Sequence, residues 1–143
     1  IKNEVDVSII AYGKDFERTL NLARSLGLRL NVLPKVPHEK LNQYYWDADV
    51  VIDRFKLGSL GMVSLEAIAC GRPVIAYVSS EYEEYKSFPL KDVNEEEDVA
   101  EAIVSADERL WREEYEYMRV NHDPNAIVDT IIRIYKSLSG NLK

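Results

Sequence analysis

The fold is decided by residues 53–75, which read DRFKLGSLGMVSLEAIACGRPVI. The apolar run that follows the glycine-containing loop has no strand-like alternation, and it predicts a helix over about residues 61–70. Gly71 is suited to end this helix, and Pro73 cannot continue it. A helix that is apolar on all sides is expected to be buried. A new apolar run then predicts a strand, so the whole stretch reads strand, loop, helix, turn, strand.

The neighbouring segments extend this order into an α/β pattern. Short runs rich in β-branched residues predict four strands, at residues 5–11, 29–33, 49–53 and 73–78. Helical spacing predicts further helices at residues 16–26, 41–48, 94–106, 107–120 and 125–138. Strands with little polar alternation are typical of a parallel sheet covered by helices. We expect an α/β fold with a Rossmann-like parallel sheet flanked by helices and a helical C-terminal end.

Composition excludes several classes of protein. A chain of 143 residues with 46% apolar residues suits one folded domain, so we expect a single domain over residues 1–143. The net charge of −7 argues against general binding to nucleic acid or to an anionic membrane. Cys70 is the sole cysteine, which excludes an internal disulfide and a CxxC metal site. With His38 and His122 as the two histidines, no metal or Ser-His-Asp arrangement is predicted.

The acidic excess is confined to one segment. Residues 81–116 hold 14 acidic and four basic residues, whereas residues 1–80 hold nine acidic and ten basic residues. The simplest interpretation of the acidic segment is a set of solvent-exposed helix faces. The segment lacks the ligand spacing of a calcium loop. The half of the chain that carries the glycine-containing loop is near neutral, so it is compatible with an anionic ligand.

Glu66 is the only charged residue of the predicted 61–70 helix. Side chains on a helix lean toward its N-terminus, so Glu66 is expected to point back toward the loop at residues 58–61. The first turn presents free backbone N–H groups and the positive end of the helix dipole, which bind phosphate readily. A diphosphate there, with a carboxylate one turn deeper for ribose hydroxyls, matches a nucleoside diphosphate. Two alternatives remain open: Glu66 pairs with an internal arginine or caps the backbone, and Gly58 and Gly61 are tight-turn residues.

At residues 61–74, GMVSLEAIACGRPV, the chain resembles the "Gly-x-x-x-Leu-Glu-Ala-Met-Ala-x-Gly-x-Pro-Val" signature of family 4 glycosyltransferases. These are retaining enzymes of the two-domain GT-B fold, and the signature belongs to their C-terminal, donor-binding domain. Weaker support comes from VPHEKL at residues 36–41 and YYWDADV at residues 44–50. The resemblance covers roughly residues 5–105.

The resemblance implies roles for individual residues. Glu66 matches the second Glu of the family's Glu pair, which binds the donor ribose. Lys35 and Val36 match the loop beside the nucleotide base. The loop and first turn whose amides meet the diphosphate and the sugar match a run of six residues, which are Gly58, Ser59, Leu60, Gly61, Met62 and Val63.

Two departures from the family pattern concern charge. Gly58 stands where the family has its first Glu, the contact to the donor sugar, so the identity of the sugar is not implied. The basic residues that neutralise the diphosphate in the family precede the strand with which this chain begins. Arg54 and Lys56 are candidates to replace them, and the alternative for both is an ordinary loop charge.

The resemblance also implies a biochemical setting. It implies a hexosyl-type transferase of polysaccharide or glycoconjugate biosynthesis that uses a UDP- or GDP-linked sugar and needs no separate cofactor or metal. Because Ile1 precedes a strand-like run at once, we expect a fragment that is inactive alone, without the domain's first strand and the N-terminal acceptor domain. The N-terminal domain would hold the acceptor. We expect a cytoplasmic protein, and the resemblance allows peripheral association with the inner membrane face through that domain.

Two other functions remain open from the sequence. One is a nucleotide-sugar epimerase half on the same architecture. The other is a non-catalytic nucleotide-binding module, for which Gly58 in place of Glu is the motivation.

Overall fold

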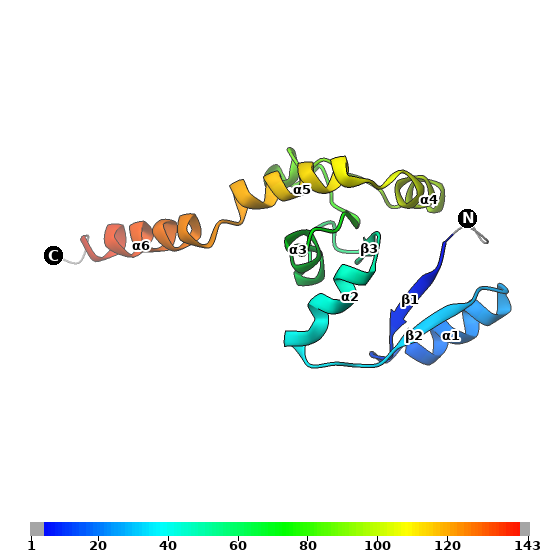
Figure 1. The fold of residues 1–143 in the computed structure, drawn as a ribbon. Coiled ribbons are helices and arrows are strands. Elements are labelled where there is room, and N and C mark those ends of the chain that lie inside the picture. Colours follow the sequence, from blue (N-terminus) through cyan, green and yellow to red (C-terminus); the bar gives the residue numbers. More distant parts are fainter. Residues whose placement is uncertain (1–4, 141–143) are drawn as a thin grey trace. The chain divides into compact units, whose positions relative to one another are not determined.

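A computed structural model describes residues 5–140 of the chain (Figure 1). Ile1, on which the expectation of a fragment rests, lies outside this range. The chain divides into two compact units, residues 1–44 and residues 45–143. The expectation of a single domain stays a prediction.

The first unit contains one parallel pair of strands. Strand β1 (Val7–Ile10) is followed by helix α1 (Phe16–Ser25) and strand β2 (Leu30–Leu33), and the register places Val7 opposite Leu30. A short 3₁₀ turn (His38–Lys40) then leads into helix α2 (Leu41–Asp47), which passes into the second unit. This is the strand–helix–strand order that the sequence predicts.

The second unit repeats this order and adds three helices. Strand β3 (Val51–Ile52), helix α3 (Met62–Ala69) and strand β4 (Val74–Ile75) come first, with β3 and β4 parallel. A 3₁₀ turn at Glu83–Tyr85 precedes the remaining helices. These are α4 (Glu96–Ser105), α5 (Glu108–Asn121) and α6 (Pro124–Gly140), and none of the helices in residues 5–140 is long and apolar enough to cross a membrane.

The structure confirms the mixed α/β class and every predicted element, with three differences. The strands are shorter than expected and form two separate two-stranded sheets. Among the described strands only β4 is buried on both faces, whereas Val7 on β1 and Val32 on β2 are exposed. The expectation that the 61–70 helix is buried all round is wrong at both ends, because Met62, Val63 and Ala69 are exposed.

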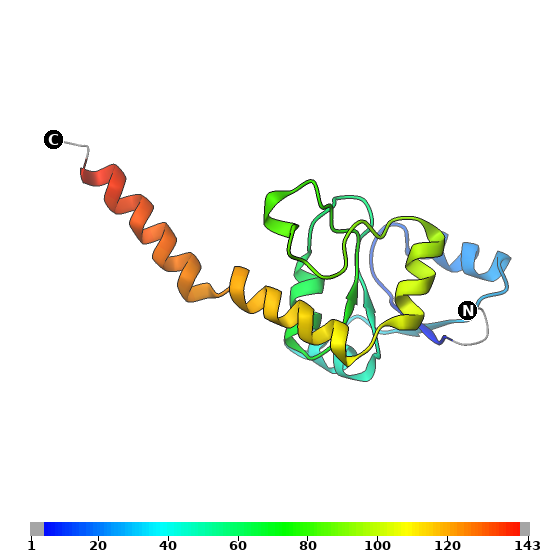
Figure 2. The same ribbon diagram turned by 90° about the horizontal axis from the view of Figure 1, so that it is seen from above.

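The core of the second unit lies between β4 and the helices around it. Ile75, Val93 and Ala102 form a buried cluster, and α4 lies next to β4 (Figure 2). Helix α3 packs against α5 through Ile68, which is completely buried. The Trp111 indole N–H also donates to the Ile68 carbonyl over 2.9 Å, so a hydrogen bond joins the two helices as well as apolar packing.

The acidic segment forms solvated surfaces, as predicted, with one exception. The acidic side chains of residues 81–116 are exposed apart from Glu114, which is completely buried on α5. The Val74 backbone N–H donates to Glu114 Oε2 over 2.9 Å at the start of β4. Burial raises the pKa of Glu114 to about 8, and the Val74 hydrogen bond opposes this shift.

The loop between β3 and α3 is held against the end of β4. The Ser79 backbone N–H donates to the Gly58 carbonyl over 2.9 Å. Gly58 has φ +66°, the left-handed conformation that favours glycine. A Cβ at this position would lie 3.0 Å from Ser79 Cβ and 3.3 Å from Tyr77 Cε1, which is closer than ordinary contacts. This position therefore requires glycine for its backbone conformation and for its surroundings.

We predict that Glu114→Gln changes how stability depends on pH. The folded protein keeps the Glu114 proton to about pH 8, whereas an unfolded carboxyl releases it near pH 4.5. The free energy of unfolding of the wild type therefore falls as pH rises between these values, because the folded state holds more protons than the unfolded state. The neutral variant should gain about 1 kcal/mol or more relative to wild type between pH 5.5 and pH 8.5. Urea denaturation at the two pH values measures this difference, and an unchanged difference would contradict the prediction.

We predict that Gly58→Ala is more destabilising than Gly71→Ala. Gly71 also has a positive φ, +86°, but no atom lies within 4 Å of a Cβ placed there. The free energy of unfolding of the Gly71 variant should therefore fall only by the cost of a left-handed backbone at alanine, about 1–2 kcal/mol. The Gly58 variant adds the overlap with Ser79, which should cost about 1 kcal/mol or more in addition. Chemical denaturation of both variants tests this, and equal losses would show that the crowding is relieved without cost.

Candidate functional site

The N-terminus of α3 offers unsatisfied backbone donors. Gly61 is the N-cap residue, its backbone is extended, and no side chain caps the helix. The first N–H groups of a helix lack an intrahelical acceptor, and the helix dipole makes this end positive. The exposed first-turn residues Met62 and Val63 leave this end accessible. The feature that the sequence predicts for diphosphate is therefore present.

Asp53 and Arg54 lie directly over this helix end. The Ser64 hydroxyl donates to Asp53 Oδ2 over 2.7 Å, and Arg54 Nε lies 3.9 Å from Asp53 Oδ1. The Asp53 side chain is 12% exposed and the Arg54 side chain is 40% exposed. The carboxylate is thus shielded and fixed by Ser64, while the guanidinium beside it can reach a ligand.

Gly61 leaves the space that this pair of side chains occupies. A Cβ at Gly61 would overlap the Arg54 guanidinium and would lie 2.5 Å from Asp53 Oδ2. The conformational freedom of Gly61 is not the reason for its presence, because its extended backbone suits any residue. It is the missing side chain that lets the guanidinium and the carboxylate approach the first turn of α3.

The rest of the 58–63 loop is fixed by backbone contacts and by Tyr85. Ser59 and Leu60 are half-buried. Burial and the Glu84 charge raise the pKa of Tyr85, while a hydrogen bond with the Leu60 backbone opposes the shift. The Tyr85 hydroxyl thus stays neutral in the physiological range and contacts the backbone of the loop.

Glu66 lies one turn into α3 and has a hydrogen-bond partner on α2. The Tyr45 hydroxyl donates to Glu66 Oε2 over 2.9 Å. Glu66 is half-buried, and Tyr45 is buried. Desolvation and the Glu66 carboxylate raise the pKa of Tyr45, so this hydroxyl keeps its proton and remains a donor. This contact with a tyrosine is one that the sequence did not predict.

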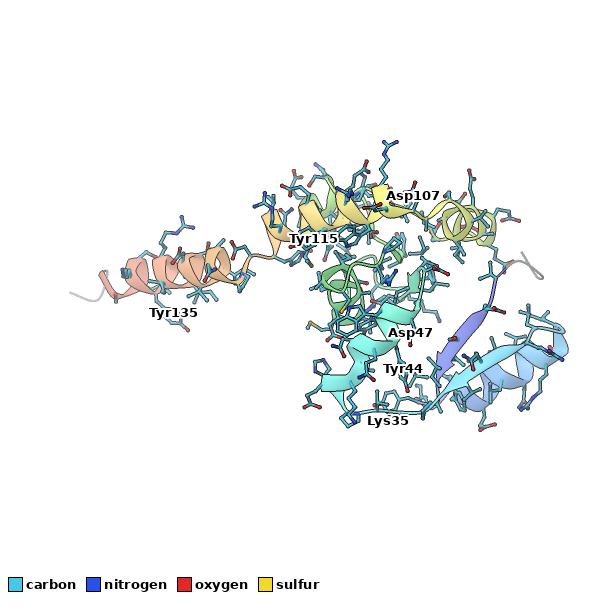
Figure 3. All side chains as sticks on the ribbon, in the orientation of Figure 1. Lys35, Tyr44, Asp47, Asp107, Tyr115 and Tyr135 are labelled. Carbon is cyan, nitrogen blue, oxygen red and sulfur yellow. The ribbon has the colours of Figure 1, made fainter. Side chains whose placement is uncertain are left out.

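The remaining predicted residues belong to the first unit or have no fixed partner in the described residues. Lys35, which is labelled in Figure 3, and Val36 belong to the first unit. Lys35 Nζ lies 4.5 Å from the centre of the Tyr12 ring. Lys56 is exposed, and its side chain makes no hydrogen bond or ion pair within residues 5–140. No group of three or more His, Cys, Asp or Glu side chains in the same range could hold a metal ion.

Three supporting residues could not be assigned from the sequence. Asp53, Ser64 and Tyr45 meet their partners across 11 to 21 residues of chain. Local periodicity does not specify such contacts, although Asp53 at the end of a predicted strand was a weak signal.

Comparisons with known proteins identify the family. A model of the family described as glycosyl transferases group 1 matches residues 1–107. The chain is 42% identical over 62 residues to a D-inositol 3-phosphate glycosyltransferase of Mycolicibacterium vanbaalenii, covering 42% of this chain and 14% of the relative. It is 36% identical over 64 residues to D-inositol 3-phosphate glycosyltransferase 1 of Catenulispora acidiphila, covering 43% of this chain and 15% of the relative. The chain thus spans about one seventh of the length of these curated relatives.

The fold is similar to that of a solved glycosyltransferase structure. A sucrose-phosphate synthase from Thermosynechococcus elongatus superposes with a TM-score of 0.65 at 23% identity, covering 90% of this chain and 35% of that protein. This match covers a larger share of the chain than the family model does. Because the family model covers more than half of the chain, and its motif and fold agree with it, the chain belongs to the glycosyl transferases group 1 family, as the C-terminal half of the GT-B architecture.

Proposed function

We propose that this chain binds the nucleoside diphosphate part of a sugar donor, UDP- or GDP-linked. The amides of residues 61–63 and the Arg54 guanidinium hold the diphosphate, and Glu66 accepts hydrogen bonds from the ribose hydroxyls. Lys35 and Val36 of the first unit contact the base. In the complete protein the sugar is transferred with retention to an acceptor.

The proposal rests on one observation, the order in which three ligand-binding groups follow one another from the start of α3 inward. The uncapped helix start, the Arg54 guanidinium over Gly61 and the Glu66 carboxylate one turn deeper follow one another. Anions favour helix N-termini, and a carboxylate is an acceptor for two vicinal hydroxyls. A nucleoside diphosphate carries its anionic and hydroxyl groups in the same order.

Stabilisation of the leaving group is the chemistry that this site supplies. When the bond between sugar and diphosphate breaks, negative charge accumulates on the diphosphate. Backbone N–H groups, a helix dipole and a guanidinium that are already in place stabilise this charge without reorganisation. Arg54 is suited to this role because a guanidinium offers several N–H donors to phosphate oxygens.

For the acceptor and the cellular setting we propose only a general class of reaction and a compartment. A hexosyl-type transfer in polysaccharide or glycoconjugate biosynthesis is consistent with the family. We place the acceptor site on an N-terminal domain outside residues 1–143 and the reaction in the cytoplasm, at the membrane face where the acceptor requires it. The chain alone is expected to bind the donor and not to transfer the sugar.

A non-catalytic nucleotide-binding module is the second candidate, and Gly58 favours it. The position that the resemblance assigns to a sugar-contacting Glu has φ +66° and is crowded by Ser79, so it cannot present a carboxylate. Both candidates predict thermal stabilisation by UDP- or GDP-sugars. Product analysis of the full-length protein with donor and candidate acceptors separates them, since only a transferase releases the nucleoside diphosphate with formation of a glycoside.

We predict that Glu66→Ala weakens the binding of a nucleoside diphosphate 10-fold or more. The carboxylate accepts charge-assisted hydrogen bonds worth about 1.5–3 kcal/mol each, and alanine removes them. Isothermal titration calorimetry with UDP and GDP measures the change. Glu101→Ala removes an exposed carboxylate on α4 and is the control. Equal affinity of the Glu66 variant and the wild type would remove the ribose role.

We predict that Arg54→Gln weakens binding of the diphosphate but not of the nucleoside. Loss of one charge-assisted contact to phosphate should lower affinity for UDP or GDP about 10-fold and leave uridine or guanosine binding unchanged. Lys56→Gln is the matched control, because it removes an exposed charge two residues away. An equal loss in both variants would indicate a general charge effect and argue against a specific contact by Arg54.

A further inference from the structure

Helix α2 is attached at two points, one on α3 and one on the turn that follows α3. Arg72, on the turn after α3, donates from Nη2 to the Trp46 carbonyl over 2.6 Å. One residue earlier on α2, the Tyr45 hydroxyl donates to Glu66 Oε2 over 2.9 Å. These contacts fix the last turn of α2 against α3, so the Tyr45 ring has a defined position relative to the Glu66 carboxylate.

The Tyr45 hydroxyl has the properties of a permanent donor. Tyr45 is only 8% exposed, and no competing acceptor for its hydroxyl is found among the described residues. Burial and the negative charge of Glu66 raise the pKa of Tyr45, so its hydroxyl stays protonated in the physiological pH range. A carboxylate has two oxygens with about four acceptor positions, and the bond from Tyr45 uses one of them.

A glutamate side chain on a helix can adopt several rotamers, and a hydrogen bond to its carboxylate restricts them. Immobilising such a side chain when a ligand binds costs conformational entropy, and a side chain that is already fixed avoids this cost. A hydrogen bond to one oxygen also sets the plane of the carboxylate, and therefore the direction of its remaining lone pairs. The Tyr45 bond thus affects any hydrogen-bond donor that binds to Glu66.

We propose that Tyr45 is a positioning residue for ribose recognition: its hydroxyl orients the Glu66 carboxylate for the ribose hydroxyls of the donor. This proposal rests on the ribose role of Glu66 given above. Tyr45 acts through Glu66 and does not touch the nucleotide. Its effect is therefore confined to ligands that carry ribose hydroxyls, which distinguishes it from a role in packing.

The test compares nucleotides with and without the ribose hydroxyls. Calorimetry of the protein with UDP and GDP, and with their 2′,3′-dideoxy counterparts, gives the ribose preference as a ratio of affinities. The wild type should prefer the ribonucleotide about 10-fold or more, and Tyr45→Phe should reduce this preference about fivefold. The affinity for the dideoxy nucleotide should stay unchanged. Tyr117→Phe is the matched control, because it removes a buried hydroxyl that donates to the Glu84 carbonyl over 2.7 Å.

A double-mutant cycle shows whether Tyr45 acts through Glu66. If it does, adding Tyr45→Phe to Glu66→Gln should not reduce the ribose preference further. An unchanged preference in Tyr45→Phe, or an equal loss of affinity for both nucleotides, overturns the proposal and leaves the ribose role of Glu66 intact. A wild type that binds the diphosphates without ribose preference overturns the role of Glu66 as well. A wild type that binds none of these nucleotides overturns the proposed function itself.

Discussion

The second unit depends on how α3 begins, because the side chains of Asp53 and Arg54 fill the space that a Cβ at Gly61 would take. This close approach connects the end of β3 to the start of the helix. It fixes the Asp53–Ser64 hydrogen bond, places a guanidinium over the helix dipole and leaves the first amides uncovered by any capping side chain. Packing against α5 then holds the rest of α3, with Ile68 completely buried.

The charges around this helix end explain why a near-neutral half of the chain suits an anionic ligand. Asp53 and Arg54 are close enough for their charges to offset each other in part. The two residues differ in accessibility, because Ser64 and the loop shield the carboxylate while the guanidinium stays more exposed. A ligand therefore meets one accessible cation and a helix dipole, and selection rests on local geometry rather than on long-range attraction.

The sequence predicted those features that local pattern controls. The apolar run and Gly71 predicted the limits of α3, and helical spacing over residues 125–138 predicted α6. The contacts between Tyr45 and Glu66 and between Val74 and Glu114 could not be predicted, because they join segments 21 and 40 residues apart. Burial of Glu114 was missed for the same reason, since its acidic neighbours are solvated and only its position on α5 turns it inward. The pairing of strands into two small sheets likewise depends on contacts beyond the local pattern.

The environment of Gly58 limits the substitutions that the loop between β3 and α3 tolerates. Its backbone carbonyl accepts from the Ser79 amide, and its Cα faces the Ser79 and Tyr77 side chains. A carboxylate cannot be introduced at residue 58 by a single substitution, because the loop would have to leave its left-handed conformation and residue 79 would have to retreat. Residues 58 and 79 are therefore mutually contingent: the amino acids tolerated at one depend on the amino acid present at the other. A path to a glutamate in this loop passes first through changes on the segment after β4.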